Sequence, residues 1–454
     1  MIKKKYICGE IRTTFIIHIN KLPDILKMKS DTTIIKRQFL NSLKRGTGEA
    51  YLIVRDNPKI DFSNLLIKGA LKNFGYDGQS ENSRAQYIYD IYLQSNQQQK
   101  IRKAILKGLE TEKEDTWSLT HLFDLVKIFA QQGDNEAKQT IFDRFLTNPI
   151  EYSDWVGYSE ILELDGLEGL FYIAEKYGIC IDKNPDNIQD NYIAKHFQDN
   201  NPNIKVFEEL ENAAKTNRFI KIYLDTIKQT EYNWKEQKDE NIIYNDIIDE
   251  VLNSNPYISF IRGRELTESE VLKVAERLQM EKNKTKMEKL LYVFNYHKFP
   301  FDSEFILNIA KHKTNLNNRI KEFAIDALRF LQSDNIRQFA LDKIKKTNQP
   351  ATYANILISN YKEGDYKLLT SIAKKFKSEH IIEWLAISYI DIYTANKTTE
   401  CKEPLEVLYS KMNCSIHRND IIRILLDNNV LSDKLKEEVI YDCDLETRKL
   451  LDKN

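Results

Sequence analysis

The sequence predicts an all-α protein, built as a superhelical α-solenoid of stacked antiparallel helix pairs. Gly and Pro are scarce, with 14 and 9 residues in a chain of 454. Sheet-rich folds need more of the turns that these two residues form, so their scarcity favours helices. Apolar residues also recur at helical spacing in short segments. Such segments cannot bury an apolar face alone, and they therefore require stacked neighbours.

The clearest pair of helices lies between Asn317 and Lys346. Apolar residues follow one helix face in its first half, at Ile320, Phe323, Ala324, Ala327, Leu328 and Leu331. Ser333 or Asp334 can cap a second helix. The same spacing returns on that helix at Ile336, Phe339, Ala340 and Ile344. The short link predicts that the two helices form an antiparallel hairpin.

This stretch resembles a HEAT-type repeat, in which two amphipathic helices carry Ala in mid-helix, Asp near the turn and Arg early in the second helix. The residues that carry the resemblance are Ala324, Ala327, Asp334, Arg337 and Ala340. The resemblance covers this one unit closely and the rest of the chain loosely. It implies a curved solenoid of the HEAT and armadillo class. By analogy of fold alone, it also implies a scaffold or adaptor role.

In chain order, the sequence divides into four parts. Residues 1–30 hold a short apolar run, Thr14–Ile19, that fits either a strand or a buried helical turn. Residues 31–180 are predicted to be N-terminal helical repeats, and residues 204–454 to be C-terminal HEAT-like repeats. Residues 181–203 are rich in Asn, Asp and Pro, and we expect a loop or subdomain boundary there.

Local signals place several helix ends and one turn. A helix is predicted over Asp165–Gly178, capped by its first residue and closed by its last. Capping boxes are predicted at Thr267-x-x-Glu270 and Thr285-x-x-Glu288. The segment Arg45–Gly48 is interpreted as a plain turn between helices. The Lys and Ser/Thr that end a phosphate-binding loop are absent after it.

Charge is balanced overall but unevenly distributed. The formal net charge is −1, which gives no general argument for nucleic-acid binding. Locally, residues 1–45 carry a net charge of +8, residues 142–200 carry −8 and residues 271–346 carry +7. A nucleic-acid binder would use the two basic blocks as phosphate contacts, and its best candidates are Lys282, Lys284, Lys286 and Lys289.

Cysteine content and hydropathy predict a cytoplasmic protein. The five cysteines form no C-x-x-C pair and are odd in number, which favours a reducing compartment over a disulfide framework. No stretch approaches the roughly 20 apolar residues that a membrane-spanning helix needs, so we expect no membrane association.

Two polar groupings in the sequence are candidate sites. Asp77, Glu81 and Arg84 lie in the unusually polar segment Tyr76–Arg84, which could be a recognition surface or a hydrogen-bonded turn before the next helix. Trp117, His121 and Asp124 can share one helix face. We interpret the second grouping as a solvated polar face rather than a general base, because no nucleophile or oxyanion element accompanies it.

The function predicted from these observations is a non-catalytic scaffold or adaptor that binds a protein partner on a concave surface. Its partner-binding candidates are Asp77, Glu81 and Arg84, together with the four lysines if the partner is a nucleic acid. We expect no cofactor and no metal site, because the histidines form no H-E-x-x-H motif and no i, i+4 pair, and the cysteines form no C-x-x-C pair. A less favoured alternative is a HEAT-like DNA glycosylase, for which Asp154-Trp155 in the acidic block is a poor match.

Overall fold

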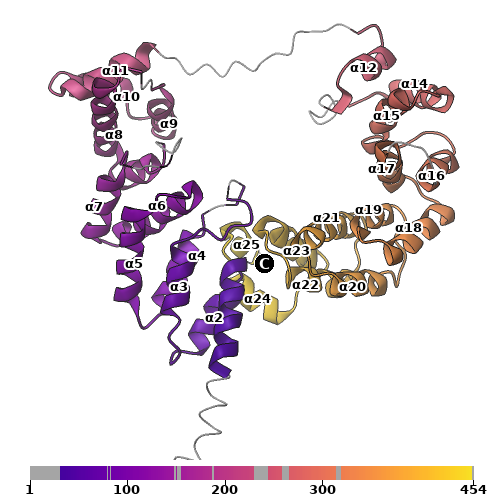
Figure 1. Cartoon of the computed structure of the whole chain (residues 1–454), viewed down its shortest axis with the longest axis horizontal. Helices are drawn as coiled ribbons and strands as arrows, with labels where there is room; N and C mark the ends of the chain where they lie inside the picture. Colours follow the sequence, from indigo (N-terminus) through magenta and orange to yellow (C-terminus); the bar gives the residue numbers. More distant parts are fainter. Residues whose placement is uncertain are drawn as a thin grey trace, which may run out of the picture. The chain divides into compact units, whose positions relative to one another are not determined.

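The described part of the chain is helical wherever it has regular structure (Figure 1). The computed structural model describes residues 31–451, apart from 79, 82, 148–149, 151–154, 187–188, 230–243, 258–264 and 313–317. No strand occurs among these residues, which confirms the all-α prediction. The prediction for residues 1–30 lies outside the described residues, as does that for Asp154.

The chain divides into two compact units. The first contains residues 1–235 and 437–454, and the second contains residues 236–436. The predicted loop or boundary at residues 181–203 therefore lies inside the first unit. Residues 437–451 thus belong to the unit formed by the beginning of the chain, which no sequence signal predicts.

The first unit begins with helical residues 31–45. Its later helices are α2 (Glu49–Asp56), α3 (Ser63–Ala70), α4 (Ala85–Leu93), α5 (Gln98–Thr111), α6 (Thr116–Gln131), α7 (Asn135–Arg144), α8 (Tyr158–Lys183), α9 (Tyr192–Asn200), α10 (Val206–Ala214) and α11 (Arg218–Gln229). From α2 to α8, each helix packs against the next helix but one, which gives two rows of helices. Apolar side chains from all of these helices form one continuous core.

Helix α8 is longer than the helix predicted over Asp165–Gly178. It runs from Tyr158 to Lys183 with a kink at Gly166, where φ is 56°. Asp165 lies before the kink, and its carboxylate pairs with Lys138. Gly178 does not end the helix. A Cβ atom at this position would lie 1.9 Å from the carbonyl oxygen of Phe219, so Gly178 allows α11 to pack closely against α8.

Residues 437–451 pack on the start of the first unit, at the turn between residues 31–45 and α2. A Cβ atom on Gly48 would lie 1.8 Å from the carbonyl oxygen of Glu438, so only glycine permits this approach. The backbone N–H of Cys443 donates to the carbonyl oxygen of Gly46 over 2.8 Å. Tyr441 stacks on Tyr51, with ring centroids 3.8 Å apart. The glycines of the turn therefore accommodate the chain's own C-terminal segment.

The second unit consists mainly of short helices. They are α12 (Ile247–Asn253), α14 (Glu268–Met280), α15 (Lys284–Tyr292), α16 (Ser303–Lys311), α17 (Asn318–Ala327), α18 (Asp334–Lys346), α19 (Pro350–Ala354), α20 (Tyr366–Lys375), α21 (Glu379–Ala395), α22 (Lys402–Tyr409) and α23 (Ser415–Asp427). Short 3₁₀ segments follow or precede some of them, at Val293–Asn295, Leu328–Phe330, Asn355–Ile358 and Thr399–Cys401. The division between the units falls within α24 (Asp433–Val439), and α25 (Leu445–Lys449) belongs to the first unit.

Odd-numbered helices of the second unit form a continuous row. Helix α15 packs against α17, α17 against α19, α19 against α21, and α21 against α23. Even-numbered helices pack on this row, as α16 does on α17 and α22 does on α23. Each helix therefore contacts helices close to it in sequence. The layer of odd-numbered helices places α15, α17, α19, α21 and α23 side by side in that order.

The stretch predicted as a helical hairpin contains the two expected helices, but they pack differently. Ser333 is the N-cap of α18 and accepts a hydrogen bond from the N–H of Ile336, as predicted. Ala324, Ala327 and Ala340 are buried. However, α17 packs mainly against α15 and α16, and α18 packs mainly against α19. The helix pairs are therefore α16 with α17 and α18 with α19, one helix out of register with the expected hairpin.

One of the two predicted capping boxes forms. The hydroxyl of Thr267 accepts from the N–H of Glu270, and the carboxylate of Glu270 accepts from the N–H of Thr267. The box predicted at Thr285 is wrong, because Asn283 is the N-cap of α15. Glu288 is buried instead, and it accepts a hydrogen bond of 2.7 Å from the hydroxyl of Tyr257.

Candidate functional site

The polar segment Tyr76–Arg84 is mainly an internal network. The guanidinium of Arg84 lies 3.0 Å from the carboxylate of Glu81, and their side chains are only 3% and 2% exposed. Arg84 also donates to the carbonyl oxygen of Lys44 over 2.6 Å. Burial removes both residues from the surface that we predicted for partner binding. Asp77 is exposed, and it accepts a hydrogen bond from Ser80.

His121 is a core residue, so the interpretation of its helix face as solvated is wrong. Its side chain is buried, and its Nδ1 atom lies 3.4 Å from the hydroxyl of Ser83. The pKa of His121 is lowered to about 4, mainly by burial; the charge of Asp124 opposes this shift and that of Arg84 contributes to it. The imidazole is therefore neutral at neutral pH. Trp117, on the same helix, packs against Gly78.

The four predicted lysines do not act as one surface. Lys282, Lys284 and Lys286 are exposed at the start of α15. Lys289 is half-buried, and its Nζ atom donates to the carbonyl oxygens of Leu252 and Ser254 over 2.7 and 3.1 Å. Those carbonyl groups lie at the end of α12, where a lysine commonly satisfies acceptors that the helix leaves open. Lys289 thus has a structural role.

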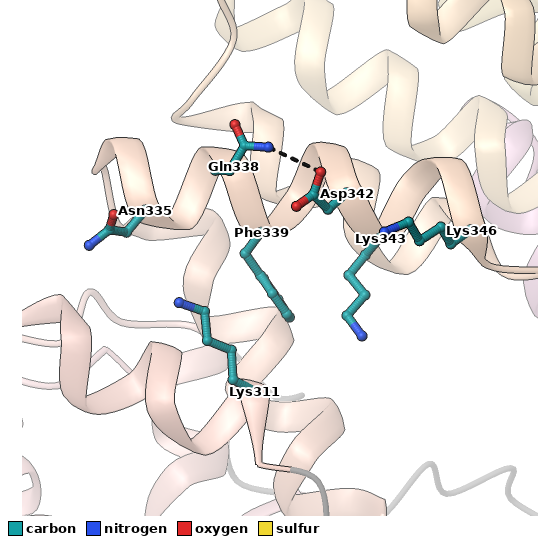
Figure 2. A pocket seen from close by; sticks show the side chains of 7 residues that line it. All are labelled: Lys311, Asn335, Gln338, Phe339, Asp342, Lys343 and Lys346. Carbon is teal, nitrogen blue, oxygen red and sulfur yellow. Dashed lines mark hydrogen bonds between the residues drawn. The ribbon is translucent and has the colours of Figure 1, made fainter.

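A small pocket of about 380 Å³ lies between α16 and α18. Its floor is Phe339, and Figure 2 shows Lys311 reaching from α16 toward that ring. Lys343 also lies over the ring, with its Nζ atom 5.8 Å from the ring centroid. Asp342 faces the pocket too, and it accepts a hydrogen bond from Gln338. The pocket is basic but shallow, since most of its lining side chains are exposed.

A larger groove of about 540 Å³ crosses three consecutive helices of the odd-numbered row, α17, α19 and α21. Trp384 lines it from α21, and the side chain is 53% exposed, the highest of the large aromatic residues described. His380 lies one turn earlier on the same helix, with its ring edge-on to the indole at 6.1 Å between centroids. The groove thus presents an uncovered aromatic platform on one wall.

The opposite wall of the groove carries hydrogen-bond acceptors. Glu322 and Asp326 lie one turn apart on α17, and Asn355 follows α19. Burial raises the pKa of Asp326 to about 6, and Arg329 opposes this shift. Among the described residues, the side-chain oxygen of Asn355 is buried without a hydrogen-bond partner. An unsatisfied acceptor beside two carboxyl groups suits a ligand that brings N–H donors.

Three possible metal-binding side chains converge between α21 and α23. Glu383, Cys414 and His417 each offer one ligand atom, and these atoms lie within 4.8 Å of one another. Cys414 is the N-cap residue of α23 and is buried, whereas Glu383 and His417 are half-buried. Cys180, Cys401, Cys414 and Cys443 are the described cysteines, and none of these four forms a disulfide.

Comparison with protein-family models finds none that matches the sequence, and no curated protein matches it significantly. The HEAT-type resemblance of the stretch from Asn317 to Lys346 therefore stays a prediction. Within the described part of the chain, no helix has the length and apolar content required to span a membrane.

Sequence reasoning missed both the groove and the cluster of three ligands. Trp384, Asp326 and Asn355 are far apart in sequence, and only the packing of α17, α19 and α21 brings them to one groove. For the cluster, a partial signal was present. Cys414 and His417 have C-x-x-H spacing, which places their side chains on one helix face. Their third member comes from another helix.

Proposed function

We propose that this chain is a non-catalytic helical-repeat scaffold that binds a protein segment in the groove across α17, α19 and α21. The observation that carries the proposal is the exposed Trp384 opposite the acceptors of Glu322, Asp326 and Asn355. Aromatic side chains in a concave surface are typical anchors of protein recognition. A solenoid of the HEAT class is supported by the row of next-but-one contacts, and a cytoplasmic location by the cysteine content.

The partner segment is expected to carry an arginine or a lysine beside an apolar residue. A cationic side chain would satisfy the carboxylates and the open oxygen of Asn355, and it could also lie against the face of Trp384. Lys321 is the one lysine among the described residues that line the groove, and it can balance only one of the two carboxylates, Glu322 and Asp326. Room for a cation from the partner therefore remains. A polyanion, by contrast, would bring further negative charge and acceptors to the side of the groove that carries Glu322 and Asp326.

The test is a selection of random peptides against the full chain. We expect enrichment of peptides that combine a basic residue with an apolar neighbour. Trp384→Ala should weaken the selected peptides by at least about tenfold, as truncation of an interface anchor does. Trp155→Ala is the matched control, because Trp155 is similarly exposed, at 44%, but belongs to the first unit. Equal loss in both variants would contradict the proposal.

Binding should also depend on pH through Asp326. The carboxylate that attracts a cation is present above its pKa of about 6 and is lost below it, so affinity should fall between pH 7 and pH 5. His380 in the groove and the neighbouring Glu322 and Arg329 also carry or can carry charge. Asp326→Asn isolates the contribution of Asp326, and this variant should bind weakly with a flatter pH profile.

The rival function is nucleic-acid binding through the basic block of residues 271–346. We expect no tight binding to random duplex or single-stranded DNA or RNA at about 150 mM salt, because only Lys282, Lys284 and Lys286 of the predicted set are exposed. A sub-micromolar complex that is lost on changing these three lysines to glutamate would favour the rival. Its affinity would also fall steeply with salt, with a log–log slope near −0.9 per phosphate on duplex DNA.

A further inference from the structure

The convergence of Glu383, Cys414 and His417 between two packed helices combines three kinds of donor atom. A thiol, an imidazole and a carboxyl group are the side chains that bind Zn²⁺ in proteins. Cys414 is the N-cap residue of α23 and His417 lies in its first turn, and their ligand atoms lie within 4.8 Å of each other. Glu383 comes from α21, which packs against α23. The fold itself therefore assembles the set.

Polar atoms in this cluster are close together but poorly satisfied. The Nδ1 atom of His417 lies 2.5 Å from a carboxylate oxygen of Glu383. This contact is an ion pair rather than an aligned hydrogen bond, and the imidazole also interacts with the side chain of Cys414. Two polar groups in contact without an aligned hydrogen bond leave their interaction incomplete, and an ion with both as ligands would complete it.

Other roles of the cluster fit these observations less well. A nucleophilic cysteine requires an accessible sulfur atom, but the side chain of Cys414 is buried at 5% exposure. An ordinary helix cap would use the Cys414 side chain to accept an N–H of the first turn, and it makes no such bond. His417 and Glu383 are half-buried, so an ion can reach the cluster from solvent on their side.

We propose that Glu383, Cys414 and His417 form a binding site for a divalent transition-metal ion of the zinc class, with water in the fourth position. Ligands of a tetrahedral zinc ion, bound at roughly 2.0–2.3 Å, lie about 3.4 Å apart. The contact of 2.5 Å between Glu383 and His417 must therefore open by about 1 Å on binding, and the other separations, which do not exceed 4.8 Å, must reach a similar final value. The ion would join α21 to α23 next to the groove that carries Trp384, and this proposal does not depend on what the groove binds.

The experiment uses the full chain after its metal has been removed by chelation. Its cysteines are kept reduced by a reductant that is not a thiol, because thiols bind Zn²⁺ themselves. Zn²⁺ is titrated in competition with a chromophoric chelator, and one ion per chain is expected. Cys414→Ser, His417→Gln and Glu383→Gln should each weaken binding by at least about tenfold. The matched controls are His380→Gln, an exposed histidine on the same α21, and Cys180→Ser in the first unit. Both controls should bind as the wild type does.

Cobalt provides a second readout, and its result in the wild type does not depend on whether any variant folds. Wild-type chain loaded with Co²⁺ should show a thiolate-to-cobalt charge-transfer band, and Cys414→Ser should lose it while Cys180→Ser keeps it. Zn²⁺ should also raise the thermal midpoint of the wild type, because it binds only the folded state. Absence of the cobalt band in the wild type, or equal weakening of Zn²⁺ binding in the controls, would overturn the proposal.

Discussion

Buried polar side chains in the first unit show how single residues depend on their surroundings. Glu81 and Arg84 belong to a segment that looks polar in sequence, and His121 to a helix face interpreted as solvated, yet all three are buried. Arg84 forms an ion pair with Glu81, and its charge also lowers the pKa of His121. Removal of one partner of such a buried pair usually destabilises a protein by several kcal/mol, because the remaining charge has no counter-ion.

His121 should make the stability of the first unit sensitive to acid. Its pKa of about 4 in the folded chain lies below the value of about 6.5 in an unfolded chain. Below pH 6.5 the unfolded chain therefore binds a proton that the folded chain does not, and the free energy of unfolding falls as the pH falls. Between pH 6.5 and pH 5 the wild type should lose roughly 1.5 kcal/mol through this residue. Hydrogen exchange of amides in α6 measures the effect.

The comparison variant is His121→Gln, which has no titratable group in this pH range. Its amides in α6 should exchange at a rate that changes little between pH 6.5 and pH 5 once the intrinsic pH dependence is subtracted. If the two proteins respond equally to acid, the neutral state of His121 does not contribute to stability.

Much of the residue pattern could be read from the sequence, but pairing between distant residues could not. The helical spacing of Ile336, Phe339, Ala340 and Ile344 correctly identified a buried face, because burial of a helix face follows from a period that one segment contains. The cluster of Glu383 with Cys414 and His417 depends on which helices pack together. No local signal in the sequence of α21 specifies that Glu383 faces α23.

The starts of two helices show, at the level of single elements, which local signals predict the structure and which do not. Thr267 and Thr285 have identical capping-box spacing, but only the first acts as an N-cap. Asn283 precedes the second box by two residues and accepts from the N–H groups of both Thr285 and Lys286. Asn is a stronger N-cap than Thr, so α15 begins earlier than the box predicted. Glu288 then packs inside, against Tyr257.

Helix α17 offers a direct test of the packing of the odd-numbered row. Ala327 is buried where α17 contacts its neighbours, so Ala327→Arg introduces a charge without a counter-ion into a closely packed space. We expect this variant to lose at least about 3 kcal/mol of unfolding free energy, or not to fold. Denaturant unfolding followed by circular dichroism measures the change.

Glu322→Arg, on the same helix, places the same side chain at an exposed position. It should change stability by no more than about 0.5 kcal/mol, because a surface substitution of this kind makes few new contacts. Melting of Ala327→Arg at the wild-type midpoint would mean that α17 is not packed as described.

The whole molecule is organised by the return of its last residues to the first unit. Besides the contact of Gly48 with Glu438, the guanidinium of Arg448 lies 2.7 Å from the carboxylate of Asp90 on α4. Arg55 of α2 similarly lies 2.9 Å from Glu437. The sequence did not predict this arrangement, because the turn around Gly48 contains no signal for the segment that fills it. An aromatic stack and two ion pairs between distant segments can be seen only in the folded chain.

Deletion of residues 440–454 should therefore destabilise the first unit selectively. Hydrogen exchange should become faster in α2 and α4, which lose Tyr441 and Arg448 as partners, and should not change in α18 to α21 of the second unit. Gly48→Ala should have a similar effect, with a cost of roughly 1–3 kcal/mol typical of overpacking.

The control for this deletion removes residues 452–454 only, since the contacts described above involve none of them. It should leave exchange in α2 and α4 unchanged. Uniform acceleration across both units after the longer deletion would show instead that the C-terminal segment supports the chain as a whole.

The return of the C-terminal segment to Gly48 also fixes an order of events during synthesis. A ribosome adds roughly 5–20 residues per second, so about 200 residues between the two parts of the first unit take on the order of 10–40 s to make. Throughout that interval Gly48 and Tyr51 lack their partners, while residues 236–436 emerge and can fold. The first unit to be made is thus the last to be completed, and chains released early would expose the surface that Tyr441 covers in the finished protein.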